Sequence, residues 1–510
     1  MAEVQEKEYI GMTIGPIFDT INLTSSPAAL WAASYMFSSL TRFICEVLTE
    51  KGVPSKNIVS PYYDKDAKLL NKNDGVGLFH DRIVFCTEGV ADVPDMAAVR
   101  NNAIDKLCTA FGFAGDDVAY IKEYVKVSWV KYRATNAIDA GAKALDCLEL
   151  AKSFVFKEEQ NPILSLFVNA KEDKDTPIEE QEMVGKNEAV KKLTKSFNNF
   201  QLRKGSRNVL KSLEDIVKTG SGFKKFKYYA MVRSDGDNMS QIIRSLKDDG
   251  EVTDYSETCL KYCSAVAEAV GEYGGVTIYS GGDDLLAILP CEKDGTTVFD
   301  FVSKVNGLFN KNFEKYHKPT SLSFGITIAY YKFPLYEALD ASYSLLTGVA
   351  KKLKNCMAVN LQKHAGQSEG LIISNAALDD WIKYQKQTAA KAVVNGKKDE
   401  NDKEENKNEI LLSAMHKLEK FKRAFKAAKD KPTIQNLFVN TFDAAAHENN
   451  VFVHETLPEL FHFLQCLEGY GGSRIYAFNE KGIIKDDAVL IMYYALRILK
   501  FFVEKDGGKE

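Results

Sequence analysis

The sequence predicts an α+β protein with two ferredoxin-like domains followed by a C-terminal helical bundle. Two stretches, one near the N-terminus and one after residue 223, alternate short apolar runs typical of strands with segments of helical spacing. A third region, from about residue 370 to 510, has helical spacing throughout. The length of 510 residues and a content of 45% hydrophobic and 27% charged residues fit a folded chain of roughly three or four domains.

The first domain is predicted over residues 1–156, and a charged, mostly helical connector over residues 157–222. The N-terminal elements run strand, helix, strand, strand, which is the first half of a ferredoxin-like unit. In chain order the predicted elements are a strand at 9–18, a helix at 28–48, strands at 58–63 and 82–86, and helices at 97–113 and 137–156.

The second domain is predicted over residues 223–365 and has the complete β-α-β-β-α-β order. Its predicted elements are a strand at 227–232, helices at 238–247 and 254–272, strands at 275–279 and 285–289, a helix at 296–316, a strand at 321–331 and a further helix at 335–354. Turns are expected at 234–237 and 280–284. Two such units in one chain suggest a diverged internal duplication.

The remaining residues, 366–510, are predicted to form the helical bundle. The run KKDENDKEENKNE at 397–409 holds no large apolar residue, so we expect a solvated loop there.

Charge and cysteine content exclude several classes of protein. A net charge of −4 and a pI of about 6.1 exclude a nucleic-acid-binding polycation, so RNA contact requires a local basic face or partner subunits. The nine cysteines are scattered through apolar segments and predict reduced, packed thiols. Cys259 and Cys263 lack a second Cys/His pair, so no zinc site is predicted. With a polar, acidic start and no apolar run long enough to span a membrane, the chain is expected in the cytoplasm.

The motif Tyr279-Ser280-Gly281-Gly282-Asp283-Asp284-Leu285 carries the chemistry. Adjacent glycines allow a tight β-hairpin and let phosphates approach the backbone. Two consecutive carboxylates at a hairpin tip repel each other, and divalent cations can compensate them. Asp235 ends the strand expected beside this hairpin and would face Asp283 and Asp284. Three carboxylates around one point predict a two-metal site for phosphoryl transfer.

Other interpretations of these motifs stay open. The GGDD motif alone could be a surface turn, DGDN an Asx turn, and a calcium site would need a loop pattern that is missing. Asn238 could cap the following helix or touch a nucleotide, and the cap is favoured. Lys351 and Lys352 could reach a triphosphate or form a solvated face. The His80-Asp81 dipeptide precedes a strand and is not expected to bind metal.

The ordered motifs resemble the large, polymerase-like subunit of type III CRISPR effector complexes, in the III-B (Cmr) branch. The resemblance covers most of the chain. The matching segments are GPIFDTI and LWAASYMFSSL in the first domain, and SDGDNM, YSGGDDLLAILP, SFGITIAYYKFPLYEALDASYSLL and CMAVNLQKHAGQ in the second. The resemblance implies two facing palm domains plus a helical domain, and assembly with other Cmr subunits, CRISPR RNA and target RNA.

The implied activity belongs to antiviral defence: RNA-activated nucleotidyl transfer from ATP, with two Mg²⁺ or Mn²⁺ ions, making a 3′–5′ linked adenylate second messenger. The product is a cyclic oligoadenylate or, as in some members without an N-terminal HD nuclease domain, an AMP conjugate of S-adenosylmethionine. The first palm begins within the opening residues, so no HD nuclease activity is expected. A diguanylate cyclase and a non-catalytic RNA scaffold are the alternatives.

The site residues follow from the motifs and the resemblance together. The catalytic residues are Asp235, Asp283 and Asp284, and the metal ligands are these three with Gly236. The nucleotide-binding candidates are Ser280, Gly281, Gly282, Asp237, Asn238 and Lys351. The first palm lacks its own GGDD and would bind the acceptor. If that acceptor is S-adenosylmethionine, its positive charges favour carboxylates, and Asp64 and Glu149 are the candidates.

Overall fold

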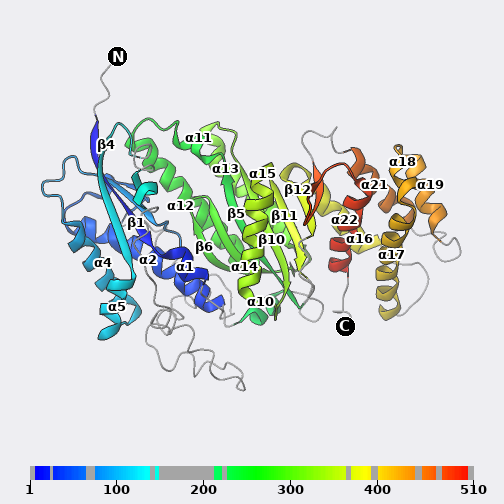
Figure 1. Ribbon diagram of the computed structural model, residues 1–510, viewed down its shortest axis with the longest axis horizontal. Helices are drawn as coiled ribbons and strands as arrows, with labels where there is room; N and C mark the ends of the chain where they lie inside the picture. The colour runs from blue at the N-terminus through cyan, green and yellow to red at the C-terminus, as the bar shows by residue number, and fades with distance from the viewer. Residues whose placement is uncertain are drawn as a thin grey trace, which may run out of the picture.

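The computed structural model describes residues 6–22, 27–64, 75–137, 144–148, 212–220, 227–362, 369–391, 400–442, 451–466 and 474–503. Figure 1 shows an elongated molecule, with the N-terminal domain at one end, a large sheet in the middle and the C-terminal helices at the other end. Within these described ranges, no helix has both the length and the apolar character to cross a membrane.

The N-terminal domain is a ferredoxin-like unit, as predicted. Its four-stranded antiparallel sheet has the order β2-β3-β1-β4. The strands are β1 (Lys7–Gly15), β2 (Ile58–Ser60), β3 (Arg82–Cys86) and β4 (Lys126–Ala134). The helices are α1 (Ile17–Asn22), α2 (Pro27–Glu50), η1 (Ser55–Asn57), α4 (Met96–Phe111) and α5 (Asp116–Tyr124). The sequence interpretation missed α5 and β4, the strand that completes the unit.

The second domain repeats this arrangement, which agrees with the predicted duplication. Its core strands lie in the order β10-β5-β7-β6, the same succession of fourth, first, third and second strand. These strands are β5 (Tyr228–Asp237), β6 (Val276–Gly281), β7 (Asp284–Pro290) and β10 (Ser321–Tyr330). The helices and short elements are α10 (Leu213–Thr219), α11 (Met239–Ile243), α12 (Asp249–Glu272), β8 (Glu292–Lys293), β9 (Thr296–Thr297), α13 (Val298–Phe313) and η4 (Glu314–Tyr316).

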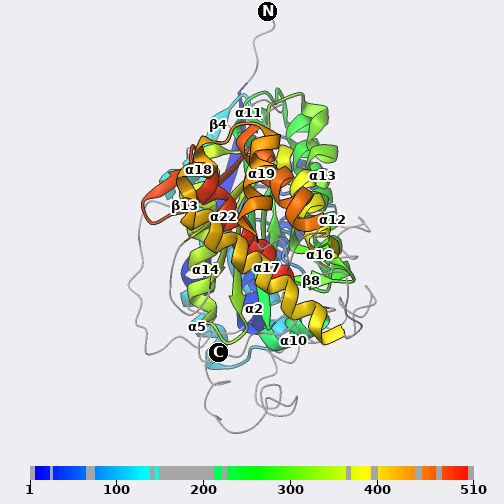
Figure 2. The ribbon, with the colours of Figure 1, turned by 90° about the vertical axis from the view of Figure 1, so that its right-hand side faces the viewer.

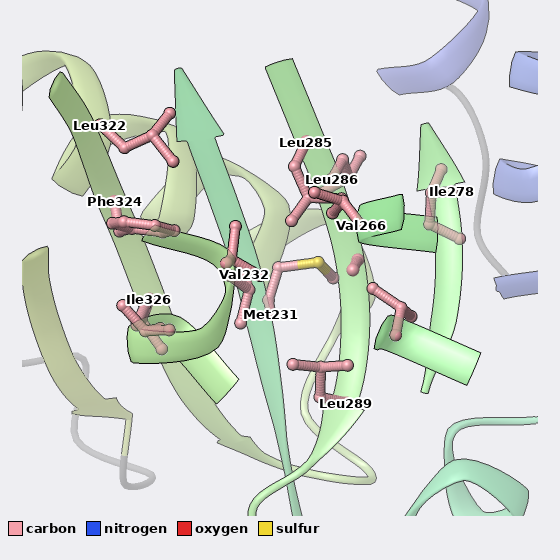
Figure 3. Close-up of a cluster of buried hydrophobic side chains, with 14 of the residues drawn as sticks. Met231, Val232, Val266, Ile278, Leu285, Leu286, Leu289, Leu322, Phe324 and Ile326 are labelled. Atoms are coloured by element: carbon pink, nitrogen blue, oxygen red, sulfur yellow. The ribbon is translucent and has the colours of Figure 1, made fainter. Parts of the chain in front are cut away.

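Apolar side chains from four strands and α12 form the core on the two faces of this sheet. Figure 3 shows Met231 and Val232 of β5 between residues of β10 and β7, with Val266 of α12 beside Ile278 of β6. These side chains are fully or almost fully buried. Burial of apolar side chains on this scale dominates the stabilisation of a domain, so this core stabilises the strands that carry the site residues.

The central sheet extends beyond the predicted unit, and this corrects the prediction of a purely helical C-terminal region. It continues through β11 (Cys356–Gln362), β12 (Gly370–Ser374), β13 (Ile475–Asn479) and β14 (Gly482–Ile484) to eight strands. Short apolar runs such as GLIIS do not distinguish a buried strand from a helical segment by periodicity, because they are shorter than two helical turns.

A helical bundle covers the far end of this sheet, as predicted (Figure 2). Its helices are η6 (Asn375–Ala377), α16 (Leu378–Lys391), α17 (Glu400–Lys420), α18 (Lys422–Ala427), α19 (Lys431–Thr441), the π-helix η7 (Phe452–Thr456), α21 (Leu457–Cys466) and α22 (Ala488–Val503). The second domain has three further helices that follow β10, namely α14 (Leu335–Ser344), the π-helix η5 (Leu345–Ala350) and α15 (Lys351–Leu353), and α14 and η5 pack against β10. The prediction of a loop at 397–409 is wrong from Glu400 onward, where α17 begins. The Glu and Lys residues of this run are good helix formers.

The two ferredoxin-like domains contact each other through α12 and the edge of β6. Asp249, at the start of α12, accepts hydrogen bonds from Lys7 Nζ and Tyr9 Oη, each at 2.8 Å. Farther along the interface, the backbone N–H of Ser280 donates to the carbonyl of Gly77 at 3.0 Å. The hairpin that holds the acidic motif is therefore tied directly to the first domain.

Candidate active site

The central position of β5 in the domain decides where its acidic residues lie. β5 pairs with β10 on one side and with β7 on the other. Its register with β10 continues through Asp235, opposite Ser323, to Asp237, opposite Ser321. The predicted turn at 234–237 is therefore wrong: these residues are strand, because β10 is long enough to pair with them. Alternation along the strand places Asp235 and Asp237 on one face.

The GGDD motif forms the tip of the β6–β7 hairpin, as predicted. Gly281 pairs with Asp284, so Gly282 and Asp283 form a two-residue loop. Gly282 has a φ of +68°, a conformation that costs glycine little. A Cβ on Gly281 would lie 2.4 Å from the Tyr279 hydroxyl, so that ring packs across the glycine. Both glycines are needed for the hairpin to present its two carboxylates.

Strand pairing brings the three predicted catalytic carboxylates together. Ser234 pairs with Leu285, and the next residues of the two strands are Asp235 and Asp284. The backbone N–H of Gly236 donates to Asp283 Oδ2 at 3.1 Å. The three aspartates thus surround one point at the end of β5, from one strand and one hairpin tip.

The crowding of these carboxylates raises their pKa values. Burial raises the pKa of Asp283 to about 6, and the Asp235 carboxylate adds to the increase. Partial desolvation of the Asp284 carboxylate by the protein around it, together with the Asp283 and Asp235 carboxylates, raises the pKa of Asp284 well above its usual range. The rest of the Asp284 residue is exposed at the edge of the site. Burial also raises the pKa of Asp235, against the opposing effect of Lys351. The protein therefore compensates this negative charge only in part.

Lys351 provides that partial compensation. Its Nζ lies 3.0 Å from Asp235 Oδ1 and 3.3 Å from Asp237 Oδ1, and it donates to the Gly236 carbonyl at 2.6 Å. The sequence interpretation identified this lysine as a candidate, and the structure brings it to the carboxylates.

The π-helix η5 positions Lys351. This segment lies between α14 and Lys351, and π-turns insert an extra residue that shifts everything after them. The helix backbone approaches β10 closely at Gly325, where a Cβ would lie 2.4 Å from the Ser342 carbonyl oxygen and 2.5 Å from the Leu346 amide nitrogen. Gly325 and the π-turn together hold Lys351 at the end of β5.

Asp237 has a structural role in the site, whereas Asp235 is one of the predicted metal ligands. Its side chain is buried, and it accepts hydrogen bonds from the hydroxyls of Ser321 and Ser323 and from the backbone N–H of Asn355, at 2.7 to 2.9 Å. These contacts connect β5, β10 and the segment before β11. Asp237 thus stabilises the floor of the site, and this burial leaves little side-chain surface for the nucleotide contact predicted from the sequence.

Two further nucleotide candidates have local structural roles. Ser280 is fully buried, and its hydroxyl donates to the Cys263 carbonyl at 3.3 Å. The cap predicted for Asn238 is wrong: it adopts a left-handed conformation with φ +60° and makes no side-chain cap hydrogen bond. Its amide instead donates to the Pro319 carbonyl at 3.1 Å and accepts from Lys354 at 2.6 Å. Asn238 therefore joins the end of β5 to its neighbours at the edge of the site.

The residues present fit a hard divalent cation. Asp235, Asp283, Asp284 and the Gly236 carbonyl offer only oxygen atoms, the donors that Mg²⁺ and Mn²⁺ prefer. Their raised pKa values show negative charge that added cations would relieve. In the part of the chain that the structure describes, no three His, Cys, Asp or Glu side chains are already arranged as a metal site. In the structure, the Lys351 ammonium contacts the Asp235 carboxylate and the Gly236 carbonyl, which are two of these oxygen donors.

One predicted acceptor residue lies in the first domain, and the other lies outside the residues that the structure describes. Asp64 follows β2 in the first domain and is half-buried, and burial of Tyr62 together with the Glu257 and Asp64 carboxylates raises the pKa of Tyr62. Glu149 lies outside the described residues, as does most of the predicted connector at 157–222. His80 is half-buried and lies 3.2 Å from the Ser60 hydroxyl, and burial lowers its pKa to about 4.

The sequence interpretation missed Arg233 and Tyr343. Arg233 lies on β5 two residues before Asp235, so the two side chains share a face. Its Nε donates to Ser342 Oγ at 3.1 Å, and its guanidinium lies 5.6 Å from the centre of the Tyr343 ring. Burial lowers the pKa of Arg233 to about 10, while Tyr343 and the nearby Asp284 oppose this. The sequence signal that could have identified Arg233 is a charged residue within the apolar pattern of a predicted strand.

Comparisons with known families agree with this architecture. Residues 228–358 match the family model described as Cas10/Cmr2, second palm domain, and residues 9–130 match the model described as CRISPR-associated protein Cmr2, N-terminal. The chain is also similar to the CRISPR system Cmr subunit Cmr2 of Pyrococcus furiosus, with 34% identity over 169 residues. That match covers 28% of this chain and 19% of the relative's length.

Solved structures share the fold over nearly the whole chain. A Type III-B Cmr-beta complex bound to cognate target RNA contains a chain that matches with a TM-score of 0.55 and 13% identity, covering 98% of this chain and 83% of that one. The Csm1-Csm4 cassette in complex with one ATP matches with a TM-score of 0.53 and 15% identity, covering 98% and 70%. At these identities the likeness concerns the fold.

Proposed function

This chain belongs to the Cas10/Cmr2 family of type III-B CRISPR subunits, and we propose that it is a nucleotidyltransferase that joins adenylate units from ATP. The observation that carries the proposal is the convergence of Asp235, Asp283 and Asp284 at the end of β5. Such a cluster, incompletely compensated by Lys351, is suited to two divalent cations and a triphosphate. Fold similarity to a chain in complex with ATP supports the choice of nucleotide.

The three aspartates and the Gly236 carbonyl would hold two Mg²⁺ or Mn²⁺ ions, which would neutralise the triphosphate and lower the pKa of an attacking ribose hydroxyl. The protein's own contribution is positioning. Gly282 has open space beside its Cα, which leaves the hairpin backbone there accessible to phosphates, and the hydrogen bond from the Ser280 N–H to the Gly77 carbonyl ties the hairpin to the first domain. Asp237 keeps the end of β5 in register with β10.

Lys351 is the proposed phosphate contact on the β11 side of the site. Its stem comes from α15, and its ammonium already lies 3.0 Å from the catalytic Asp235. A small change in its side-chain torsions would bring the ammonium to a phosphate bound at Asp235. Pyrophosphate would leave as a hydroxyl attacks the α-phosphate, with electrostatic stabilisation supplying most of the rate.

The wider context of this activity is part of the same proposal. The chain would act as a subunit of a type III-B effector complex, with CRISPR RNA and target RNA bound through the complex and target RNA switching the activity on. Likeness to a chain in a Cmr-beta complex bound to cognate target RNA supports this assembly. The first palm would hold the acceptor, with Asp64 and Glu149 as candidates if that acceptor is S-adenosylmethionine.

The experiment is to incubate the assembled complex and target RNA with labelled ATP and Mg²⁺ or Mn²⁺, with and without S-adenosylmethionine, and to identify products by mass spectrometry. Oligoadenylates from ATP alone would establish the cyclase product, and a product requiring S-adenosylmethionine would establish the conjugating one. The Asp283→Ala/Asp284→Ala variant is the control and should abolish either product. Absence of any product across metals and RNAs would favour a non-catalytic scaffold.

A further inference from the structure

Arg233 is a second positive charge on the face of β5 that holds the catalytic carboxylates. Arg233 and Asp235 are two residues apart, about 7 Å along an antiparallel strand. Lys351 lies on the opposite side of Asp235, between it and Asp237. Two cations therefore flank Asp235 along one line, with the GGDD hairpin beside them.

These two cations differ in how many of their donors are already used. The three N–H groups of the Lys351 ammonium face three oxygens, those of Asp235, Asp237 and the Gly236 carbonyl. Arg233 has five N–H donors, and among the described residues only Nε–H has a partner, the Ser342 hydroxyl. Within the same part of the chain, no carboxylate lies within ion-pair distance of Arg233. Four donors of a half-buried guanidinium thus remain available to a ligand.

The surroundings fix the guanidinium in place. The Ser342 hydroxyl accepts a hydrogen bond from Arg233 Nε and in turn donates to the Leu339 carbonyl at 2.8 Å. The Tyr343 ring lies over the guanidinium and is itself 42% exposed, so the pair lies at the molecular surface. A guanidinium that is anchored at Nε and covered by an aromatic ring has lost most of its rotamer freedom before any ligand binds.

We propose that Arg233, held by Ser342 and Tyr343, binds the terminal phosphates of the nucleoside triphosphate. The inference rests on the proposed function, which puts the reacting α-phosphate at Asp235, Asp283 and Asp284. The spacing along β5 is comparable to the reach of a triphosphate from its α- to its γ-phosphate. Guanidinium groups bind phosphate through two parallel hydrogen bonds, and the four Nη hydrogens can provide them.

A purely structural role for Arg233 makes a different prediction. Asp284 and Asp340 lie near enough to affect the charge of Arg233, so it could serve only to offset them. In that case its removal would weaken binding of every ligand that depends on the site's shape, including ligands without terminal phosphates. Contact with the terminal phosphates instead requires a loss that grows with the number of phosphates.

The test is equilibrium binding of ATP, ADP, AMP and inorganic triphosphate to the full chain in Mg²⁺, by calorimetry. Arg233→Met keeps the apolar stem, Arg233→Lys keeps the charge without the fork, and Tyr343→Ala removes the ring. Arg244→Met, at an exposed arginine after α11, is the matched control. If Arg233→Met fails to fold, the Lys and Tyr343 variants carry the test.

We expect Arg233→Met to weaken ATP and triphosphate binding roughly tenfold to a hundredfold and to leave AMP within about twofold. Arg233→Lys should retain part of the affinity, Tyr343→Ala should lose less than Arg233→Met, and Arg244→Met should match the unmodified chain. Equal losses for ATP and AMP, or no loss, would overturn the assignment while leaving aspartate-dependent turnover of ATP intact. If the unmodified chain bound neither ATP nor triphosphate, the proposed function itself would fail.

Discussion

Gly236 donates its backbone N–H to the Asp283 carboxylate at 3.1 Å, and this hydrogen bond joins the end of β5 to the turn between β6 and β7. A Cβ at position 236 would lie 2.4 Å from Asp283 Oδ2 and 2.6 Å from Met239 Cγ. Because glycine has no Cβ, Gly236 allows two sequence motifs that are 47 residues apart to meet at one point.

Gly236→Ala should separate Asp235 from Asp283. Because the added methyl overlaps the carboxylate, we expect nucleotidyl transfer to fall at least tenfold, a loss of about 1.4 kcal/mol or more in transition-state stabilisation. The measurement is the initial rate of pyrophosphate release from ATP. Gly271→Ala, at a position of α12 with nothing within 4 Å of the new methyl, is the control and should keep full activity.

Asp283→Asn should stabilise the metal-free chain at neutral pH. The folded state raises the pKa of Asp283 from 3.8 to about 6, so the ionised carboxylate costs the folded state free energy above pH 6 and nothing below pH 3.8. This cost is at most about 3 kcal/mol. Asparagine can still accept the Gly236 hydrogen bond while removing the charge.

Thermal denaturation in chelator at pH 7.5 and at pH 4 checks this sign. The variant should melt higher than the unmodified chain at pH 7.5, and the difference should shrink at pH 4, where the aspartate is protonated. Added Mg²⁺ should raise the melting temperature of the unmodified chain more than that of the variant. A variant that melts lower at pH 7.5 would contradict the idea of uncompensated charge.

Gly325→Ala should displace the π-helix and with it Lys351. The new methyl would overlap the Ser342 carbonyl and the Leu346 amide, which are backbone atoms that cannot rotate away. We expect lower stability and a clear loss of activity in the same rate measurement. Gly348→Ala lies in the π-helix itself with nothing within 4 Å of the added methyl, so it should be close to neutral. Equal effects of the two changes would argue against close packing at Gly325.

Ser323→Ala should weaken the floor of the site more than Ser321→Ala. The buried Ser323 hydroxyl contacts both oxygens of Asp237, whereas the half-buried Ser321 contacts one. Loss of a partner to a buried charge costs about 1 to 3 kcal/mol, so the Ser323 variant should unfold at lower urea concentration. Ser321→Ala should lose less because water can replace its hydroxyl. The reverse order would show that Asp237 depends mainly on other partners.

The sequence contained enough information for the two ferredoxin-like units and for the convergence of Asp235, Asp283 and Asp284. Strand periodicity, the glycine pair and the order of the motifs are local signals, and the structure agrees with them. The strand character of residues 234–237 was missed because it depends on pairing with β10, more than 80 residues away. β12 was missed for another reason, because its five-residue run GLIIS is too short to carry a period that identifies a strand.

The roles of single polar residues were the hardest to predict. Ser280 and Asp237 belong to active-site motifs, yet burial gives their side chains structural partners. Asn238 follows a strand and precedes a helix, the usual setting for a cap, but its left-handed backbone directs the amide elsewhere. Arg233 was missed because its importance depends on α14, which packs over β5 from more than 100 residues later in the chain.

The most direct test of the central claim is pyrophosphate release from ATP by the assembled, RNA-bound complex, with Asp235→Asn, Asp283→Asn and Asp284→Asn compared one at a time. If the three carboxylates form one metal-dependent site, each variant should lose activity by a hundredfold or more, roughly 3 kcal/mol in barrier height. Each should remain folded, and the double variant of Asp283 and Asp284 should be little worse than either single one. Activity that survives these changes, or that persists in chelator, would contradict the account.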